Sequence, residues 1–225
     1  MPDLYVITGA NGAGKSTVGF SYLPKIIQNK YEVFDGDKLA MQKRIELHKT
    51  KATPSFKEAR RLSDEWVYEL FDSLVKKALK IRDDFVYEGH FPDDENWVTI
   101  KRFKRAGYKI HFIFFGLKDT DLSELRVKDR AIHGGHDVSR PQIDRNYYRN
   151  LDQVNKRYKY FDELQIVDTS ASNSHKVLVL LKNGQIDFAV HHGKLPEWFE
   201  RFLPKLYKKI SNRDNEDFFD KLKKG

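Results

Sequence analysis

The chain has 225 residues, no cysteine, and a net charge of +8 at neutral pH from 41 Lys and Arg against 33 Asp and Glu. The lack of cysteine excludes disulfides, zinc sites with cysteine ligands and thiol catalysis, and it fits a reducing cytoplasm. The hydrophobic content of 40% suffices for one α/β domain, and the longest apolar run, Ile110 to Leu117, is too short to span a membrane, so we expect a cytoplasmic protein.

The first predicted elements are a buried strand over residues 4–8 and a helix over 16–27, joined by a glycine-rich loop. The loop fits the phosphate-binding pattern G-x-x-x-x-G-K-S/T, whose glycines let backbone N–H groups wrap a phosphate. We expect ATP to be bound by Gly9, Ala10, Asn11, Gly12, Ala13, Gly14, Lys15, Ser16 and Thr17. In this pattern Lys15 reaches the β- and γ-phosphates and Ser16 holds Mg²⁺. The alternative is a glycine-rich turn that binds nothing.

A second predicted strand, residues 31–34, ends at Asp35-Gly36-Asp37, and a helix is predicted over 38–47. Ligands of open α/β sheets bind beyond the carboxyl ends of the strands, which places both carboxylates at the ligand edge. Asp37 is the candidate general base for a substrate hydroxyl, and Asp35 is a candidate substrate contact. The alternative is that one aspartate ends the strand while the other caps the helix.

Apolar residues at helical spacing predict a long helix over 55–80, capped by Ser55 and Glu58 and serving as core scaffold. A third strand over 84–88 ends in Glu88, and His90 follows. Glu88 is expected to contact a ligand hydroxyl or, through water, Mg²⁺, and residues 85–88 are the nearest counterpart of a Walker B strand. The alternative for Glu88 is a buried acid that accepts local N–H groups.

A helix over 94–106 and a strand over 108–115 lead to a helical segment over 119–160, interrupted at Gly134-Gly135 and restarted near Ser139. Residues 101–160 hold 15 Lys and Arg against 7 Asp and Glu, which accounts for the whole positive excess. We predict a lid over about 119–160 that closes over the phosphates, with Arg126 catalytic and further contacts from Arg130, Arg140 and Arg145. A solvated helical face, or a surface for nucleic acid, is the alternative.

The chain ends with a predicted strand over 164–167, a hairpin of residues 176–181 and 185–190 joined through Asn183-Gly184, a helix over 195–210, and a frayed polar end over 211–225. The predicted fold class is α/β: a P-loop NTPase with a mostly parallel central sheet flanked by helices, a helical lid, and a C-terminal hairpin and helix. We expect a kinase-like domain over 1–190 and a C-terminal helical extension of that domain over 191–225.

Residues 3–181 resemble the zeta-toxin family of P-loop kinases, in particular its stand-alone branch labelled predicted ABC-type ATPases. Besides the loop, the resemblance rests on Asp35-Gly-Asp37, Tyr87-Glu88-Gly89-His90, Arg126-Val-Lys-Asp-Arg130 and Gly134-Gly-His-Asp-Val138. It implies transfer of a phosphoryl group from ATP to a sugar hydroxyl of UDP-N-acetylglucosamine, and neutralisation by a small antitoxin.

The resemblance also places individual residues. Asp37 falls on the catalytic base, Glu88 on a substrate contact and Arg126 on a phosphate-binding arginine. His90 stands where a threonine contacts substrate, and His136 stands where some family toxins carry a second lid arginine. These two departures leave the acceptor open.

The sequence therefore predicts an ATP- and Mg²⁺-dependent kinase that acts on a hydroxyl of a small molecule. Because of the basic segment, nucleic acid is not excluded as a partner, and a polynucleotide 5′-hydroxyl kinase is the first alternative. A nucleotide-binding regulatory module without turnover is an alternative of another class.

Overall fold

The structure is a computed structural model that describes residues 1–50, 55–133, 137–172 and 174–224, with side chains as far as residue 216. In this part of the chain, seven strands form one sheet in the order β2-β3-β1-β4-β5-β6-β7. The strands are β1 (Asp3–Gly9), β2 (Phe34–Asp35), β3 (Phe85–Glu88), β4 (Lys109–Gly116), β5 (Glu163–Asp168), β6 (Lys176–Lys182) and β7 (Gln185–Ala189). The first five run parallel, whereas β6 and β7 are antiparallel, which confirms the predicted fold class.

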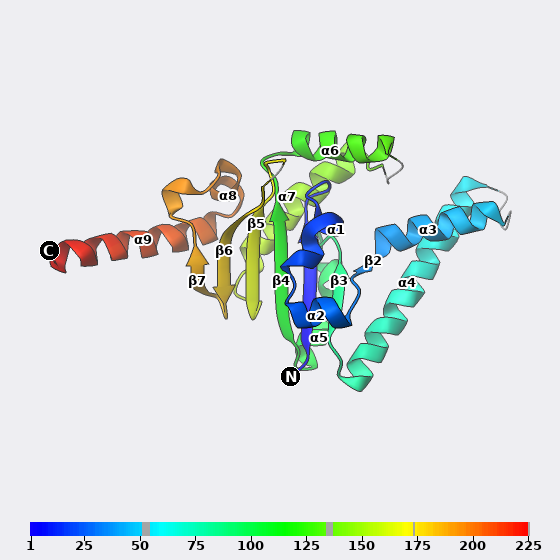
Figure 1. Ribbon diagram of the computed structural model, residues 1–225, viewed down its shortest axis with the longest axis horizontal. Helices are drawn as coiled ribbons and strands as arrows, with labels where there is room; N and C mark the ends of the chain where they lie inside the picture. Colours follow the sequence, from blue (N-terminus) through cyan, green and yellow to red (C-terminus); the bar gives the residue numbers. More distant parts are fainter. Residues whose placement is uncertain (51–54, 134–136, 173, 225) are drawn as a thin grey trace.

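Helices lie on both faces of the sheet, with α1 and α2 in front and α5 and α7 behind in the view of Figure 1. The α-helices are α1 (Lys15–Val18), α2 (Lys25–Lys30), α3 (Gly36–Lys49), α4 (Phe56–Ile81), α5 (Val98–Arg105), α6 (Thr120–Ile132), α7 (Arg140–Arg157), α8 (Glu197–Phe202) and α9 (Pro204–Lys224). Short 3₁₀ turns are η1 (Gly19–Tyr22), η2 (Asp94–Trp97) and η3 (His192–Lys194). Among the described helices, none is long and apolar enough to cross a membrane.

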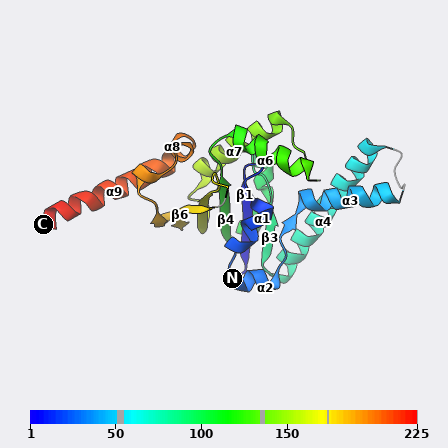
Figure 2. The ribbon, with the colours of Figure 1, turned by 45° about the horizontal axis from the view of Figure 1, so that its top comes forward.

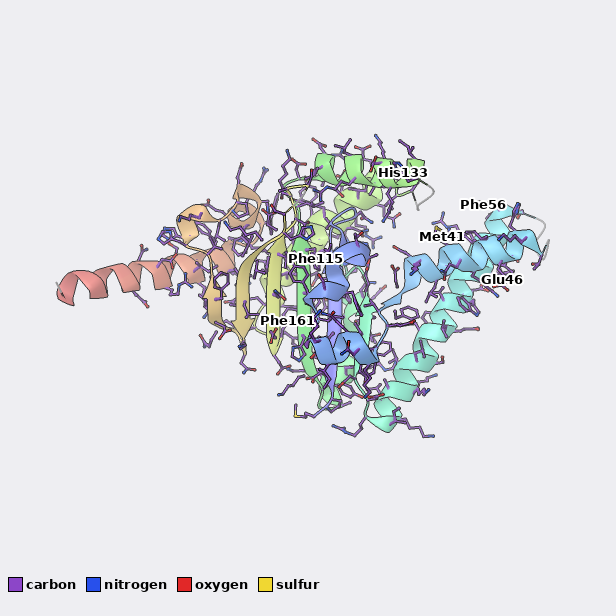
Figure 3. All side chains as sticks on the ribbon, viewed as in Figure 1. Met41, Glu46, Phe56, Phe115, His133 and Phe161 are labelled. Atoms are coloured by element: carbon purple, nitrogen blue, oxygen red, sulfur yellow. The ribbon has the colours of Figure 1, made fainter. Side chains whose placement is uncertain are left out.

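The core forms around β4, which is central in the sheet and buried on both faces. Parallel strands covered on both sides are continuously apolar, and β4 reads Ile-His-Phe-Ile-Phe-Phe after its first residue. The rings of Phe112 and Phe161 stack with centroids 4.3 Å apart. Figure 3 labels Phe161 and Phe115 in this central body.

The single helix predicted over 16–27 is wrong in its extent. The helix stops at Val18, continues as the turn η1, and restarts as α2 after Pro24. Proline has no N–H to donate to the preceding turn, so a continuous helix cannot pass through Pro24 with all its hydrogen bonds. The second strand is also shorter than predicted, since only Phe34 and Asp35 pair with β3.

Helices α3 and α4 form an arm that projects from one edge of the sheet (Figures 1 and 2). Ser55 caps α4 as predicted, because its Oγ accepts the N–H of Glu58 at 3.2 Å. The prediction of core scaffold holds for the C-terminal half of α4, where Val75 and Ala78 are buried. It is wrong for the start of the helix, where Phe56 is 77% exposed.

The C-terminal prediction is correct for the hairpin and wrong for the helix. Asn183 and Gly184 have φ of 50° and 73°, as a type I′ hairpin turn requires. In place of one helix over 195–210, α8 and α9 meet at Leu203 and Pro204, and the segment predicted to fray is helical to Lys224. The apolar side chains of both helices join the core of the sheet: Phe199, Leu203, Leu206 and Ile210.

Candidate active site

The loop between β1 and α1 has the backbone that its glycines predict. Gly12 has φ of +69°, and a Cβ on it would lie 2.9 Å from the Cβ of Arg126 on α6. Gly9 has φ of +146°, and a Cβ there would lie 2.1 Å from the carbonyl oxygen of Phe115. The loop is therefore held between β4 and α6, and only glycine fits these two positions.

Lys15 lies at the floor of a cavity of about 360 Å³ beside this loop. Its Nζ donates to the carbonyl oxygens of Ala10 at 3.0 Å and Gly9 at 3.4 Å. Burial lowers the pKa of Lys15 below its ordinary value, and the nearby carboxylates of Glu88 and Asp37 oppose the shift. The loop thus holds a cation where a phosphate can replace the two carbonyls as its partner.

Ser16 and Glu88 are in direct contact across the sheet edge. The Ser16 hydroxyl lies 2.9 and 3.0 Å from the two carboxylate oxygens of Glu88. Glu88 ends β3, which pairs with β1 in a register that sets Ile7 beside it. Burial raises the pKa of Glu88, and Lys15 opposes this shift. Glu88 therefore lies at the end of the strand next to β1, in contact with the hydroxyl of the phosphate loop.

The two aspartates after β2 have different positions. Asp35 caps α3 by accepting the N–H of Lys38 at 3.0 Å, so it both ends the strand and caps the helix. The alternative reading, in which the two aspartates end the strand and cap the helix, thus describes Asp35, which has both roles, and leaves Asp37 without either. Asp37, in the first turn of α3, lines the cavity with Lys15, as Asp35 and Met41 also do. Figure 3 labels Met41 on the arm, on the side of α3 nearer to α6.

Arg126 and Arg130 of α6 line the same cavity from the opposite side. The Arg126 guanidinium donates to the carbonyls of Thr169 at 2.8 Å, Ser170 at 3.1 Å and Gly12 at 3.4 Å. The Ser123 hydroxyl of α6 donates to the carbonyl of Asn11 at 2.6 Å. The first helix of the predicted lid is therefore packed directly on the phosphate loop.

His90 lines the cavity next to Lys15 and is held by two asparagines. The amide nitrogens of Asn11 and Asn150 each lie 3.4 Å from one of its ring nitrogens. The oxygens of these amides already accept N–H groups of Asn146 and Phe91, so both amides turn their nitrogens to the ring. A neutral ring has one acceptor nitrogen, so only one of the two amides can donate to it at a time. Burial, together with the Lys15 ammonium, holds the pKa of His90 well below its ordinary value, which favours the neutral ring.

A sequence model of the zeta toxin family matches residues 1–182. The chain belongs to the zeta toxin family. Membership of this family supports a phosphotransferase activity of the kinase type. A search of curated proteins found no match.

Two solved structures share the fold of this chain. The PezAT chromosomal toxin–antitoxin system of Streptococcus pneumoniae aligns with a TM-score of 0.59 and 19% identity, over 96% of this chain and 88% of that one. AvrRxo1-ORF1, in complex with AvrRxo1-ORF2 and ATP, aligns with a TM-score of 0.63 and 14% identity, over 94% of this chain. This zeta toxin chain spans 64% of the length of the AvrRxo1 chain.

Two of the predicted lid arginines of this zeta toxin do not line the cavity. Arg140 bridges α7 to α6 through Asp121 and Glu124, at 2.8 and 2.6 Å, and also pairs with Asp144 of its own helix. Arg145 pairs with Asp93. The predicted contact His136 and the predicted hinge Gly134-Gly135 lie outside the described residues. Ser139 stands at the N-cap position of α7 but makes no capping bond.

Sequence reasoning missed the amides behind His90. Asn146 and Asn150 are 6% and 2% exposed, and they lie one turn apart on the buried face of α7. The signal was present in the sequence, because Ile143, Tyr147 and Leu151 mark that face as apolar and place both asparagines on it. Lys38 and Met41, which also line the cavity, carried no comparable signal.

A second hollow of about 720 Å³ lies between the arm and α5 and shares Glu88 and His90 with the cavity. We call it the acceptor groove. Its wall includes the rings of Phe34, Tyr68 and Phe71 and the carboxylates of Asp64, Asp72 and Glu95. Arg102 is its one basic residue among the described lining, and it contacts Asp72 at 3.3 Å.

Proposed function

We propose that this zeta toxin transfers the γ-phosphate of ATP to a hydroxyl group of a small molecule bound in the acceptor groove. The observation that carries the proposal is the junction of two hollows at Glu88 and His90. The cavity beside the loop, which we call the donor cavity, holds Lys15, Ser16 and Arg126, and the acceptor groove holds acids and aromatic rings. A kinase needs a donor site and an acceptor site that meet where the phosphoryl group passes.

In this proposal the triphosphate lies along residues 9–17, and Lys15 exchanges its two carbonyl partners for phosphate oxygens. The donors nearby fit Mg²⁺, because the hydroxyl of Ser16 and the carboxylate of Glu88 are hard oxygen ligands in contact with each other. When bound, the ion would neutralise charge on the β- and γ-phosphates. Arg126 and Arg130 would bind phosphate oxygens from the side of α6.

Asp37 is the proposed general base. It lines the donor cavity together with Glu88 and is not engaged as the cap of α3, a role that Asp35 fills. A carboxylate in this place would accept the proton of the acceptor hydroxyl as the phosphoryl group arrives. His90, a neutral ring, would contact the acceptor by a hydrogen bond and not by charge.

The acceptor implied by the family is a UDP-N-acetyl sugar, whose hydroxyls suit the carboxylates of the groove and whose rings suit Tyr68 and Phe71. A polynucleotide is less well supported. Many of the basic side chains in 101–160 are paired with acids, as in Arg140 with Glu124, Arg157 with Asp94 and Lys104 with Asp162. A basic surface whose charges are paired attracts a polyanion weakly.

A small antitoxin is the proposed protein partner, since the PezAT structure is that of a toxin–antitoxin system. We place the protein in the cytoplasm, where its proposed donor ATP is available. Binding of ATP without turnover, as a regulatory module, remains the alternative of another class, and the experiment below separates it from a kinase.

The test is an assay of ADP release and product formation with ATP and Mg²⁺, run with UDP-N-acetylglucosamine, with a 5′-hydroxyl oligonucleotide, and without acceptor. The Asp37→Asn variant should lose ~10²-fold or more in turnover while its affinity for ATP stays nearly unchanged. Asp35→Asn is the matched control, because asparagine also caps helices.

Each result assigns the function. Turnover that depends on the oligonucleotide would select the polynucleotide kinase, and ATP binding without any turnover would select the regulatory module. A loss of that size from Asp35→Asn alone, with Asp37→Asn still active, would move the base to Asp35.

A further inference from the structure

The short helix α8 contacts the end of the central strand β4, although it lies beyond the residues that the family model matches. The indole of Trp198 is 3% exposed and packs on Gly116, the last residue of β4. A Cβ on Gly116 would lie 2.3 Å from the indole, so this position has room for glycine alone. The contact joins the C-terminal extension to the end of a central strand.

The indole N–H of Trp198 also reaches the neighbouring strand. It donates at 3.2 Å to Oδ1 of Asp168, the last residue of β5. The same oxygen accepts the backbone N–H of Ser170 at 3.1 Å and the Ser170 hydroxyl. Thr169, between them, donates its N–H and its hydroxyl to the carbonyl of Gly116 at 2.9 and 3.0 Å. The turn over 168–170 is therefore fixed by two residues that Trp198 touches.

This turn holds Arg126. The carbonyl oxygens of Thr169 and Ser170 accept the Arg126 guanidinium at 2.8 and 3.1 Å, and the same guanidinium reaches the carbonyl of Gly12 in the phosphate loop. A continuous series of contacts thus runs from α8 through Asp168 and the turn to the arginine of the donor cavity.

We propose that Trp198 is a positioning residue of the phosphoryl-transfer site, which sets the place of Arg126 by fixing the turn over 168–170. The proposal rests on the proposed function, in which Arg126 binds the transferring phosphate. It gives the C-terminal extension a part in catalysis, because the indole is supplied by α8 and not by the strands and helices that form the cavity.

The test begins with Trp198→Phe, which keeps an aromatic ring against Gly116 and removes the N–H that Asp168 accepts. We expect kcat to fall about 10-fold and the KM for ATP to change less than about 3-fold, as for a group that acts in the transition state. Hydrogen exchange of the amides in 168–170 should accelerate, because the acceptor of the Ser170 N–H is less constrained.

Trp97→Phe is the matched control. Trp97 is also buried, at 1% exposure, and its indole N–H donates to the carbonyl of Phe91 at 3.3 Å, away from the turn. This variant should lower the melting temperature as Trp198→Phe does and leave kcat with saturating ATP and exchange in 168–170 unchanged. Asp168→Asn is a second route to the same effect, since it weakens the acceptor without changing its size.

A double-mutant cycle with Arg126→Ala decides whether Trp198 acts through the arginine. Two residues in one series of contacts give non-additive effects, so Trp198→Phe should cost less than about 2-fold in kcat when Arg126 is absent. An undiminished loss in that background would overturn the proposal. So would exchange in 168–170 that is the same in Trp198→Phe and the wild type.

Failure of the proposed function gives a different result. A wild-type protein that transfers no phosphate to any acceptor would contradict the kinase proposal. The exchange measurement would then decide the positioning role alone, since it needs neither turnover nor acceptor.

Discussion

The donor cavity and the acceptor groove meet at Glu88 and His90 but carry opposite charge. The donor cavity has four basic residues, Lys15, Lys38, Arg126 and Arg130, against the acids Asp35, Asp37 and Glu88. The acceptor groove has four acids, Asp64, Asp72, Glu88 and Glu95, against Arg102. One hollow is suited to phosphate oxygens and the other to hydroxyl groups.

In the proposed reaction, this difference in charge would direct the two polar ligands to different hollows. A triphosphate in the groove would meet carboxylates without enough cations, whereas the donor cavity offers a buried lysine, a hydroxyl and two arginines. The substitutions below act on one hollow and leave the other unchanged if this division is correct.

Removal of the lysine of the loop should have the largest effect. Lys15→Ala is expected to abolish the thermal stabilisation by ATP and Mg²⁺ and to lower turnover by about 10³-fold or more, because among the described residues that line the donor cavity Lys15 is the one buried cation. The melting temperature is measured with and without nucleotide. An unchanged shift on adding ATP would show that this loop does not bind the donor.

Removal of the arginine of α6 should affect catalysis more than binding. Arg126→Ala is expected to lower turnover at least ~10²-fold with little change in ATP affinity, because a positioned arginine stabilises charge that develops on the phosphoryl group. Lys128→Ala is the matched control on the same helix, since Lys128 pairs with Glu124 and is 66% exposed. A comparable loss in both variants would contradict a specific role for Arg126.

The arrangement of the donor cavity could be predicted from the sequence because it depends on residues close together in the chain. The spacing of Gly9, Gly14 and Lys15 fixes the backbone, and a strand ending in Glu88 fixes where that acid lies, so the sheet edge could be predicted. The same locality explains the correct hairpin at Asn183-Gly184 and the correct cap at Ser55.

The lid arginines show where local reasoning ends. Arg140 and Arg145 look like Arg126 in the sequence. Two of the three acids that pair with Arg140 lie on α6, however, and Asp93, which pairs with Arg145, is 52 residues away. Long cationic side chains pair with the acids that the tertiary structure brings near them. The spacing of residues in the sequence does not predict which acids these are. The role of Trp198 depends likewise on the contact between α8 and the ends of β4 and β5.

The acceptor groove can be tested apart from the donor cavity through its exposed aromatic ring. Tyr68 lines the groove and is 72% exposed. Tyr68→Ala is expected to raise the KM for the acceptor about 10-fold, because it removes a stacking surface, and to leave the KM for ATP unchanged. Phe56→Ala is the control, since Phe56 lies on the same arm, is 77% exposed and does not line the groove. Equal effects on both KM values would show that the two hollows are one site.

The smallest expected effect concerns Glu88, the acid that the two hollows share. Burial raises its folded-state pKa above the unfolded value, so the folded protein pays for ionising it. This cost is fully present above the folded pKa and disappears as the pH falls below the unfolded pKa of about 4.3. Glu88→Gln should therefore raise the free energy of unfolding by less than about 1 kcal/mol at pH 8, and the gain should vanish near pH 4.

The same variant should lose turnover at every pH, because an amide cannot serve the metal side of the donor cavity as a carboxylate does. Denaturant unfolding of Glu88→Gln and the wild type at pH 4, 6 and 8 measures the stability difference. Asp94→Asn provides a contrast of opposite sign, since hydrogen bonding by Arg157 lowers the pKa of Asp94. Its carboxylate stabilises the fold above the unfolded pKa, and that gain is lost as the pH falls. If Glu88→Gln and Asp94→Asn changed stability with pH in the same direction, the ionised carboxylate of Glu88 would not destabilise the fold. The claim that burial raises its pKa would then be wrong.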